Sequence, residues 1–313
     1  MQAKALATSR AISSARVRPD RRRIATAVLF LLPAFVIYSL LVLFPVVQAA
    51  YYGFYKWNGL GPATDNVGWD NFNRVLHDSN FQTALRHNVL ILVLSLLVQL
   101  PLALSLALIV GRQMRGRAVF RTIFFLPYVL SEVVAGVVWR FLYQPDSGLN
   151  QLIGNVYADW RPRSWLGDTN LVMYSLFVVI TWKYIGFHII LYMAGLQNIP
   201  RELEEAAALD GAGPLRVIRD VTIPLLGPTV RLSAFLSVLG SLQFFDVIWV
   251  MTTGGPVGAS ETMATYMYRF GFQRFQLGYG AAVSLVIFLL CLAFALPYQR
   301  LVMRRDYEYS GTA

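Results

Sequence analysis

The chain has 313 residues, of which 56% are hydrophobic and only 14% charged, with a formal net charge of +10 at pH 7. Soluble domains are roughly half apolar and a quarter charged, so this composition excludes an ordinary soluble protein and indicates an integral membrane protein. The Arg residues are dispersed among loops without a nucleic-acid-binding motif, so the positive charge indicates membrane topology and anionic lipid contact rather than nucleic-acid binding.

Six runs of the sequence are long and apolar enough to cross a membrane as helices. A spanning helix needs about 20 mainly apolar residues, and the alternating ten-residue strands of a membrane barrel are absent. Gln243 and Asp246 interrupt the fifth run. We predict an all-α integral membrane domain, 24–303, between a disordered N-terminal tail, 1–23, and a C-terminal tail, 304–313. The runs are 24–52, 87–110, 119–143, 171–195, 228–251 and 280–303.

The first run needs a comparison with a signal peptide, because basic residues precede it and Val47–Ala49 faintly resembles a cleavage site. The hydrophobic region of a signal peptide is about 7 to 15 residues long, and this run is about twice that length. We therefore expect it to be retained as a membrane helix.

The distribution of Lys and Arg predicts the orientation of the chain. Basic residues collect in cytoplasmic loops, and an even number of crossings puts both termini on one side. With both termini inside, the inner segments hold 18 of the 27 basic residues and the outer loops hold 8, while Lys183 lies within the fourth run. We expect both termini in the cytoplasm.

The inner loop between the fourth and fifth runs has an unusual pattern of charge. It reads "ELEEAAALDGAGPLRVIRDVTIP", starting at Glu202, and four carboxylates fall in its first nine residues. Acidic residues after Pro200 favour a helix N-terminus, and Gly211 is a typical helix stop. Pro214 suits the start of a second helix, which Pro224 ends. We predict a helix-turn-helix at the membrane surface.

The composition of this loop, 200–224, also bears on what it contacts. Interfacial lipid anchors usually carry basic polar faces and large apolar residues. This loop is acidic and rich in alanine, which favours a close-fitting protein socket. A simple membrane anchor remains the alternative.

The spacing of Glu205-Ala206-Ala207, Gly211 and Val221-x-Ile223-Pro224 resembles the EAA loop of binding-protein-dependent ABC importer permeases. The likeness extends over about 24–303 and is closest to the carbohydrate-uptake branch, the maltose-transporter type of first permease subunit. It implies the type I ABC importer permease fold, with six transmembrane helices and a cytoplasmic coupling helix-turn-helix, in a bacterial cytoplasmic membrane. Further matching stretches are "LLPAFVIYSLLVLFPVVQAAYYGF", "RGRAVFRTIFFLPYVLSEVV", "WLGD", "GSLQFFDVIWVMTTGGP" and "ETMATYMYRFGF".

In that family the loop is the coupling helix, which docks in a groove of an ATPase subunit. An alternative in which Glu205 only caps the local fold, and the alanines only favour a helix, stays open. The resemblance implies that the docking contact is made by Glu204, Glu205, Ala206, Ala207, Asp210 and Gly211.

The resemblance also implies partners and the source of energy. The partners are an ATPase dimer, a second permease subunit or a second copy of this chain, and an extracytoplasmic solute-binding protein that docks on the outer loops, 52–86 and "TTGGPVGASET". A P-loop requires a Lys preceded by Gly, and none of the lysines, Lys4, Lys56 and Lys183, follows a glycine. We therefore expect no cofactor in this chain, with ATP and Mg on the partner ATPase.

A sugar pathway combines hydroxyl-bonding groups with aromatic faces, and "TWKYIGFH" and "SVLGSLQFFD" contain both. Packing between helices is the alternative explanation for these residues. By the register of the family motifs, the resemblance assigns seven positions to the pathway, and chemistry alone adds Gln243. The seven are Tyr128, Glu132, Trp182, Gly186, Ser237, Gly240 and Ser241.

Ionisable residues inside the runs leave an ion-coupled secondary carrier as the alternative transport class, although we find no internal repeat. Glu132 is expected to face the pathway or to pair with a neighbouring Arg. Lys183 and Asp246 are expected to pair with each other or to reach the membrane surface. The sugar stays unidentified, and glycerol-phosphate-type or amino-sugar cargo remains open.

An enzymatic role is disfavoured. The three histidines, His77, His87 and His188, lack metal-ligand spacing, and no nucleophile motif or carboxylate pair is present. Cys291 cannot form an internal disulfide and is expected to be a packing residue.

Overall fold

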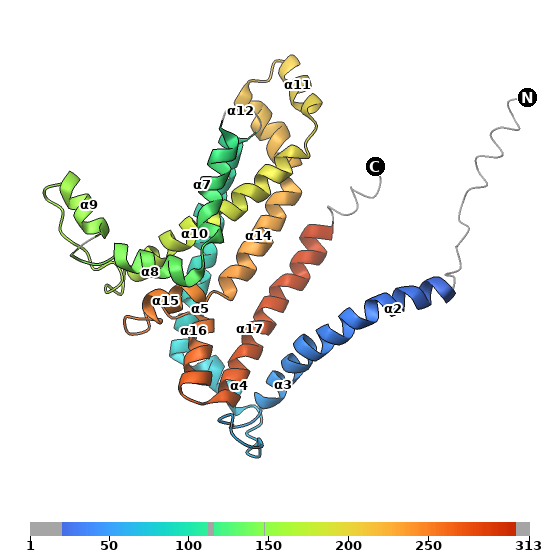
Figure 1. Ribbon diagram of the computed structural model, residues 1–313, viewed down its shortest axis with the longest axis vertical. Coiled ribbons are helices and arrows are strands. Elements are labelled where there is room, and N and C mark those ends of the chain that lie inside the picture. The colour runs from blue at the N-terminus through green and yellow to red at the C-terminus, as the bar shows by residue number, and fades with distance from the viewer. Residues whose placement is uncertain (1–20, 112–115, 147, 305–313) are drawn as a thin grey trace, which may run out of the picture. The chain divides into compact units, whose positions relative to one another are not determined.

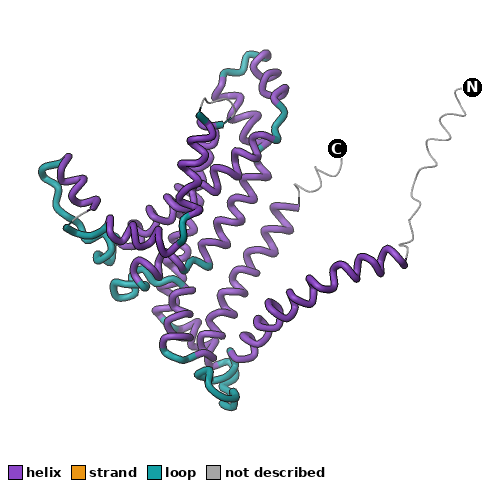
Figure 2. Tube along the Cα trace, viewed as in Figure 1, coloured by secondary structure: helices purple, strands orange, loops and turns teal. Residues whose placement is uncertain are grey.

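The computed structural model describes residues 21–111, 116–146 and 148–304. Within those ranges the chain is helical and contains no strand (Figure 2). It divides into two compact units, Met1–Ala49 and Ala50–Ala313. Of the N-terminal tail predicted to be disordered, 1–23, residues 1–20 lie outside the described residues and 21–23 begin the first helix; of the C-terminal tail, 305–313 lie outside them.

The first unit consists of one long helix. It comprises α2 (Arg21–Tyr38), the π-helical turn η1 (Ser39–Leu43) and the beginning of α3 (Phe44–Tyr52). The stretch from Val28 to Tyr52 has a mean hydropathy of 2.5, and none of its most apolar window is buried. A bare apolar helix of this length suits the hydrocarbon core of a bilayer, as predicted for the first run.

The second unit begins with the short helix α4 (Asp70–His77) and then the second span. That span is α5 (Ser79–Leu94), η2 (Ser95–Gln99) and α6 (Leu100–Val110). It starts earlier than predicted because Asp78 is its N-cap: one carboxylate oxygen accepts hydrogen bonds from the backbone N–H groups of Asn80, at 2.8 Å, and Phe81, at 3.2 Å.

The third run is two helices rather than the single helix predicted. α7 (Arg117–Val129) and α8 (Glu132–Leu142) meet at an angle of 96°. Leu130 and Ser131 between them have extended ψ angles of 142°, which end the first helix and redirect the chain. The short helix α9 (Gly148–Val156) follows.

The fourth run forms α10 (Val172–Gln197), the helix at the centre of the second unit. In Figure 1 it crosses behind α7 and beside α14, and it contacts α5, α6, α7, α8, α14 and α15. Its surroundings explain why 61% of its most apolar window is buried. α10 is therefore the helix against which these six helices pack.

The loop after α10 is a helix-turn-helix, as predicted, and lies at the upper end of the second unit in Figure 1. It consists of α11 (Arg201–Leu209), α12 (Pro214–Val217), η3 (Ile218–Thr222) and α13 (Ile223–Leu225). Pro224 does not end the second helix, because it occupies a first-turn position of α13, where its missing N–H is not needed. The bend of 65° comes one step later, at the join with α14.

The fifth run is also broken. α14 (Gly227–Leu242) and α15 (Asp246–Thr252) are separated by three non-helical residues, 243–245. The predicted single helix over 228–251 is therefore wrong. Of the polar residues that interrupted the run in the sequence, Gln243 lies in this break and Asp246 directly follows it.

The chain ends with α16 (Met263–Tyr268), η4 (Arg269–Gln273), α17 (Leu277–Tyr298) and η5 (Gln299–Met303). α16 and α4 pack against α17 at the lower end of the second unit in Figure 1. Across the whole chain, the described residues hold four unbroken helices able to cross a membrane, or six crossings if each bent pair is one span.

Candidate functional site

A cavity of about 370 Å³ lies beside the break between α14 and α15. Its walls come from η2, the end of α7, the middle of α10 and the second half of α14. Five of the eight positions predicted for the pathway line it: Tyr128, Ser237, Gly240, Ser241 and Gln243.

The other three predicted positions do not line the cavity. Gly186 lies where α10 crosses α7, and a Cβ there would overlap the carbonyl oxygen of Phe124, so this glycine permits the two helices to approach closely. Trp182 packs edge-on against Trp139, with ring centroids 5.5 Å apart. Glu132 is engaged in the polar cluster described next.

Glu132, Lys183 and Tyr184 form a polar cluster at the bend between α7 and α8. The ammonium Nζ of Lys183 lies 3.4 Å from Oε1 of Glu132, and the Tyr184 hydroxyl donates to the same oxygen at 2.8 Å. Lys183 also donates to the carbonyl oxygens of Leu130, at 2.6 Å, and Pro127, at 3.4 Å. The bend frees these carbonyls from helical partners, and the buried ammonium satisfies them.

This cluster corrects one prediction. Lys183 is 1% exposed and pairs with Glu132, so it neither pairs with Asp246 nor reaches the membrane surface. Asp246 instead lines the cavity and is exposed. The sequence could not show the pairing because the bend that brings α8 back toward α10 has no marker beyond Pro127.

Sequence reasoning missed several polar residues of the cavity. Ser95 and Gln99 come from η2, are each 2% exposed and line the cavity. They are four residues apart in an otherwise apolar run, and this spacing places them on one face of a helix. That pattern was the available signal. His188 also lines the cavity and places Nδ1 2.8 Å from the Ser233 hydroxyl.

The predicted docking residues lie on the helix-turn-helix between α10 and α14. Gly211 has a φ of +86°, which favours glycine. Its N–H donates to the carbonyl of Ala208, and the N–H of Ala212 donates to the carbonyl of Ala207, both at 3.0 Å. These two backbone hydrogen bonds form the Schellman motif, which closes a helix C-terminus. The end of α11 is therefore fixed.

Most of the predicted docking residues on this helix-turn-helix are exposed. Glu205, Ala206, Asp210 and Gly211 are exposed, and Glu204 and Ala207 are half-buried. Two leucines beside the turn, Leu209 and Leu215, are 89% and 83% exposed. The hydroxyl of Thr222 donates to Oε1 of Glu204 at 2.8 Å and ties η3 to α11.

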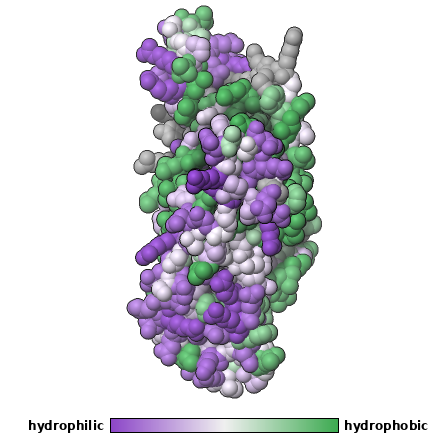
Figure 3. Space-filling view, turned by 90° about the vertical axis from the view of Figure 1, so that its left-hand side faces the viewer, coloured by the Kyte–Doolittle hydropathy of each residue, from purple (hydrophilic) through white to green (hydrophobic). Residues whose placement is uncertain are grey.

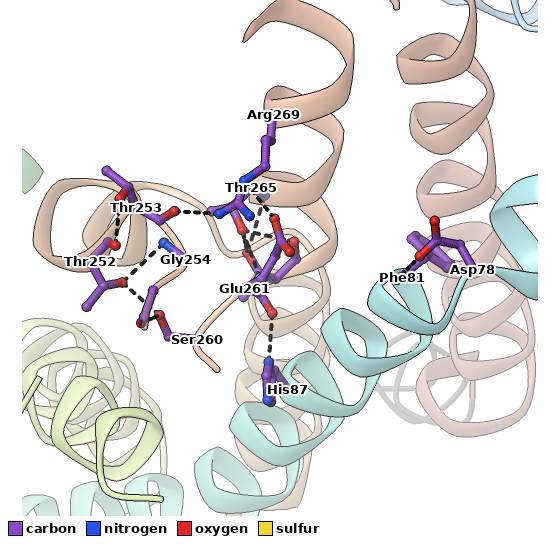
Figure 4. Close-up of polar contacts among 12 residues, drawn as sticks. Asp78, Phe81, His87, Thr252, Thr253, Gly254, Ser260, Glu261, Thr265 and Arg269 are labelled. Carbon is purple, nitrogen blue, oxygen red and sulfur yellow. Dashed lines mark hydrogen bonds and ion pairs between the residues drawn. The ribbon is translucent and has the colours of Figure 1, made fainter. Parts of the chain in front are cut away.

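A second loop, Thr253 to Thr262, joins α15 to α16 at the other end of the second unit and is held by many polar contacts (Figure 4). The guanidinium of Arg269 lies 3.2 Å from a carboxylate oxygen of Glu261 and donates to the carbonyl of Thr253 at 2.8 Å. Nδ1 of His87, on α5, lies 2.8 Å from the Glu261 carbonyl oxygen. Burial raises the pKa of the Glu261 carboxyl, and the charge of Arg269 opposes that shift.

Polar and apolar residues separate on the surface of the molecule. On the face shown in Figure 3, hydrophilic residues gather at the lower end and continue up the middle, with apolar residues on either side. Among the described residues, no group of three or more His, Cys, Asp or Glu side chains is placed to bind a metal ion. Cys291 is buried, as predicted for a packing residue.

Comparison with known proteins adds to this geometry. The model of a family described as "Binding-protein-dependent transport system inner membrane component" matches residues 99–306. A probable ABC transporter permease of Pyrococcus horikoshii is 38% identical over 273 residues, which cover 87% of this chain and 93% of the relative.

Two further relatives have names that mention cargo. The diacetylchitobiose uptake system permease NgcF of Streptomyces coelicolor is 32% identical over 89% of this chain and 84% of its own length. The sn-glycerol-3-phosphate transport system permease UgpA of Agrobacterium fabrum is 33% identical over 88% of this chain and 94% of its own length.

A chain of the bacterial alginate ABC transporter, solved in complex with an alginate pentasaccharide-bound periplasmic protein, has the same fold. The TM-score is 0.80 at 22% identity, over 92% of this chain and 98% of that chain. At this identity the likeness concerns the fold alone.

Proposed function

The chain belongs to the family of binding-protein-dependent transport system inner membrane components, and on that premise we propose that it is the permease subunit of an ATP-driven sugar importer. In this proposal it receives a sugar or sugar derivative from an extracytoplasmic binding protein and passes it into the cytoplasm by alternating access. The relative named for diacetylchitobiose uptake supports a carbohydrate cargo.

One observation carries the proposal: the EAA segment forms an exposed, rigid helix-turn at one end of the second unit. Glu205, Ala206 and Gly211 are exposed on it, and the Schellman closure at Gly211 fixes its shape. A small, acidic and preorganised helix loses little entropy when it enters a socket. Leu209 and Leu215 supply apolar surface for such a contact.

The same proposal assigns the partners and the energy source. The partners are an ATPase dimer that holds ATP and Mg, a second permease subunit, and the solute-binding protein. Hydrolysis belongs to the ATPase, and this chain contributes no cofactor site. The helix-turn-helix faces the cytoplasm together with both termini, so the loop between α15 and α16 lies on the outer side, where the binding protein docks.

The path of the mechanical signal follows from the covalent structure. The helix-turn-helix continues through α13 into α14, whose far half lines the cavity. A displacement of the loop by the ATPase is therefore transmitted along α14 to Ser237, Gly240 and Ser241. We propose that this movement opens the cavity alternately to the two sides of the membrane.

The test is a pull-down in detergent with the tagged chain and its Glu205→Lys variant. We expect an ATPase and a second permease to co-purify with the natural chain, and only the ATPase to be lost from the variant. Asp159→Lys is the matched control, because it makes the same charge reversal at an exposed position between α9 and α10 and is expected to retain both partners.

A different outcome would identify the other class of transporter. If the natural chain purifies alone and its uptake activity follows a proton or sodium gradient instead of ATP, the ion-coupled carrier is the correct class. The Glu132–Lys183 pair would then be the first candidate for the coupling site.

A further inference from the structure

We infer that the cavity selects its cargo by charge: Asp246 makes it a site for uncharged or amino-bearing sugars and excludes sugars that carry a carboxylate or a phosphate. This inference rests on the proposed function and adds the chemical class of the cargo. It separates this chain from relatives and neighbours whose names mention glycerol phosphate or the acidic polysaccharide alginate.

The cavity presents polar groups that are available to a ligand. The side chains of Ser95, Gln99 and Ser237 are 2%, 2% and 8% exposed, and none donates or accepts a side-chain hydrogen bond within the described part of the chain. None of their polar atoms is among the fully buried, unpartnered atoms of the described residues, so these atoms are open to the cavity and can bond a ligand. A polyhydroxylated ligand supplies the missing partners.

Aromatic rings complete a surface that suits a sugar. Tyr128 and Phe187 lie with centroids 5.4 Å apart, and Tyr184 and Phe244 with centroids 5.9 Å apart, and all four line the cavity. Aromatic faces pack on the C–H faces of pyranose rings while the polar groups bond the hydroxyls. The volume of about 370 Å³ is at the small end for ligand sites, which suits one or two sugar rings.

The charge of the lining has one sign. Asp246 is its one carboxylate, and neither Lys nor Arg is among the lining residues. No hydrogen bond or ion pair engages the Asp246 side chain within the described ranges. An unpaired carboxylate repels a second negative charge, whereas it accepts hydrogen bonds from hydroxyl groups and attracts an ammonium.

The buried cation of α10, Lys183, cannot offset this charge. Lys183 is already engaged by the Glu132 carboxylate and by the carbonyl oxygens of Leu130 and Pro127. Moving its ammonium toward the cavity would leave the two carbonyl oxygens unpaired and the Glu132 carboxylate without its positive partner in the interior. An anionic sugar would therefore meet Asp246 without a compensating positive group from this chain.

Three probes that differ mainly in charge test the inference: glucose, glucosamine and glucuronate. We would record ligand-detected NMR of each probe with the complex of this chain, its partner permease and the ATPase, purified without the binding protein so that its own selectivity does not contribute. We expect glucosamine to bind at least tenfold more tightly than glucuronate, with glucose between them. In Asp246→Asn this difference should fall to less than threefold, and in Asp246→Lys the order should invert.

Two further variants keep the test decisive. Gln99→Leu is expected to weaken the binding of glucose and glucosamine without changing the order of the probes. Asp159 is an exposed carboxylate outside the cavity, and Asp159→Asn is expected to leave the binding of all three probes unchanged. Glucuronate binding to the natural complex as tightly as glucose would overturn the inference. So would an unchanged order in Asp246→Asn, or no binding of any probe while ATP-dependent uptake persists. Failure of the ATPase to co-purify would instead overturn the proposed function.

Discussion

The ammonium of Lys183 and the carboxylate of Glu132, 3.4 Å apart, join the centre of α10 to the first residue of α8. The pair lies where the chain turns by 96° after α7, and Lys183 also bonds two carbonyl oxygens at that turn. One buried cation thus satisfies a carboxylate and the open end of a helix. The bend is stabilised by an electrostatic contact rather than by a turn sequence.

Removing this cation should destabilise the bend. We expect Lys183→Met to lower the free energy of unfolding by about 3 kcal/mol, because it leaves a partly buried carboxylate without its partner. The measurement is thermal or denaturant unfolding in detergent. The double variant with Glu132→Gln is expected to recover at least about 1 kcal/mol, since it removes the uncompensated charge as well; strictly additive losses would contradict this account.

Two glycines that the sequence assigned to the same pathway should respond in opposite ways to alanine. At Gly186 a Cβ overlaps the carbonyl oxygen of Phe124, whereas at Gly240 a Cβ meets nothing within 4 Å. We expect Gly186→Ala to destabilise the protein by about 2 kcal/mol through overpacking. Gly240→Ala, in a helix, should be neutral or stabilising by about 0.5 kcal/mol. Thermal unfolding of the two variants side by side measures the contrast.

The turn after α11 offers another matched pair. Gly211 has a φ of +86° and Gly213 a φ of −69°, and neither has a neighbour within 4 Å of a new Cβ. Alanine at Gly211 should cost about 1 kcal/mol of local stability, because only its backbone angle is unfavourable. Gly213→Ala should be nearly neutral. For Gly211→Ala, but not for Gly213→Ala, we expect faster amide hydrogen exchange in α11 and about fivefold less co-purified ATPase. Equal behaviour of the two variants would count against a rigid loop.

The buried Glu261 should make stability depend on pH. Its pKa is raised in the folded protein because burial disfavours the carboxylate more than Arg269 favours it. As pH rises, the unfolded chain releases the Glu261 proton before the folded protein does. The stabilisation from this group is therefore complete below the ordinary pKa of about 4.5. It declines as pH rises from there to the raised pKa of the folded protein. The difference in unfolding midpoint between Glu261→Gln and the natural chain should grow over that window, and a flat difference would refute the assignment.

The helices themselves were largely accessible from sequence, because a membrane imposes a length and a composition on any helix that crosses it. The two breaks were harder. Gln243 and Asp246 marked the interruption of the fifth run, but the end of α7 carries only Pro127, and proline is common in membrane helices without a sharp bend. A bend supported from another helix, here by Lys183, leaves no local signal.

The residues of the candidate site were likewise accessible from the sequence only in part. Tyr128 and Ser237 line the cavity on the helices that motif register assigned, and Gln243 lines it as its chemistry suggested. Contact of these residues with a sugar stays a prediction. Gly186 lies at a helix crossing and does not line the cavity, and the sequence could not separate these two positions because small residues suit both. Gln99 was missed because its importance depends on a packing neighbour, α14, that is distant in the chain. The docking role of the helix-turn-helix stays a prediction until a partner is captured.

The arrangement of α14 has a consequence for how such transporters diversify. The helix-turn-helix precedes its first residue, and the cavity lies near its last, so a helix of 16 residues, about 24 Å long, separates them. Side chains that distant accumulate changes almost independently. Under the proposed function, a duplicated gene could therefore acquire a new cargo preference around Asp246 while its product still docks to the original ATPase, so that several permeases share one ATPase.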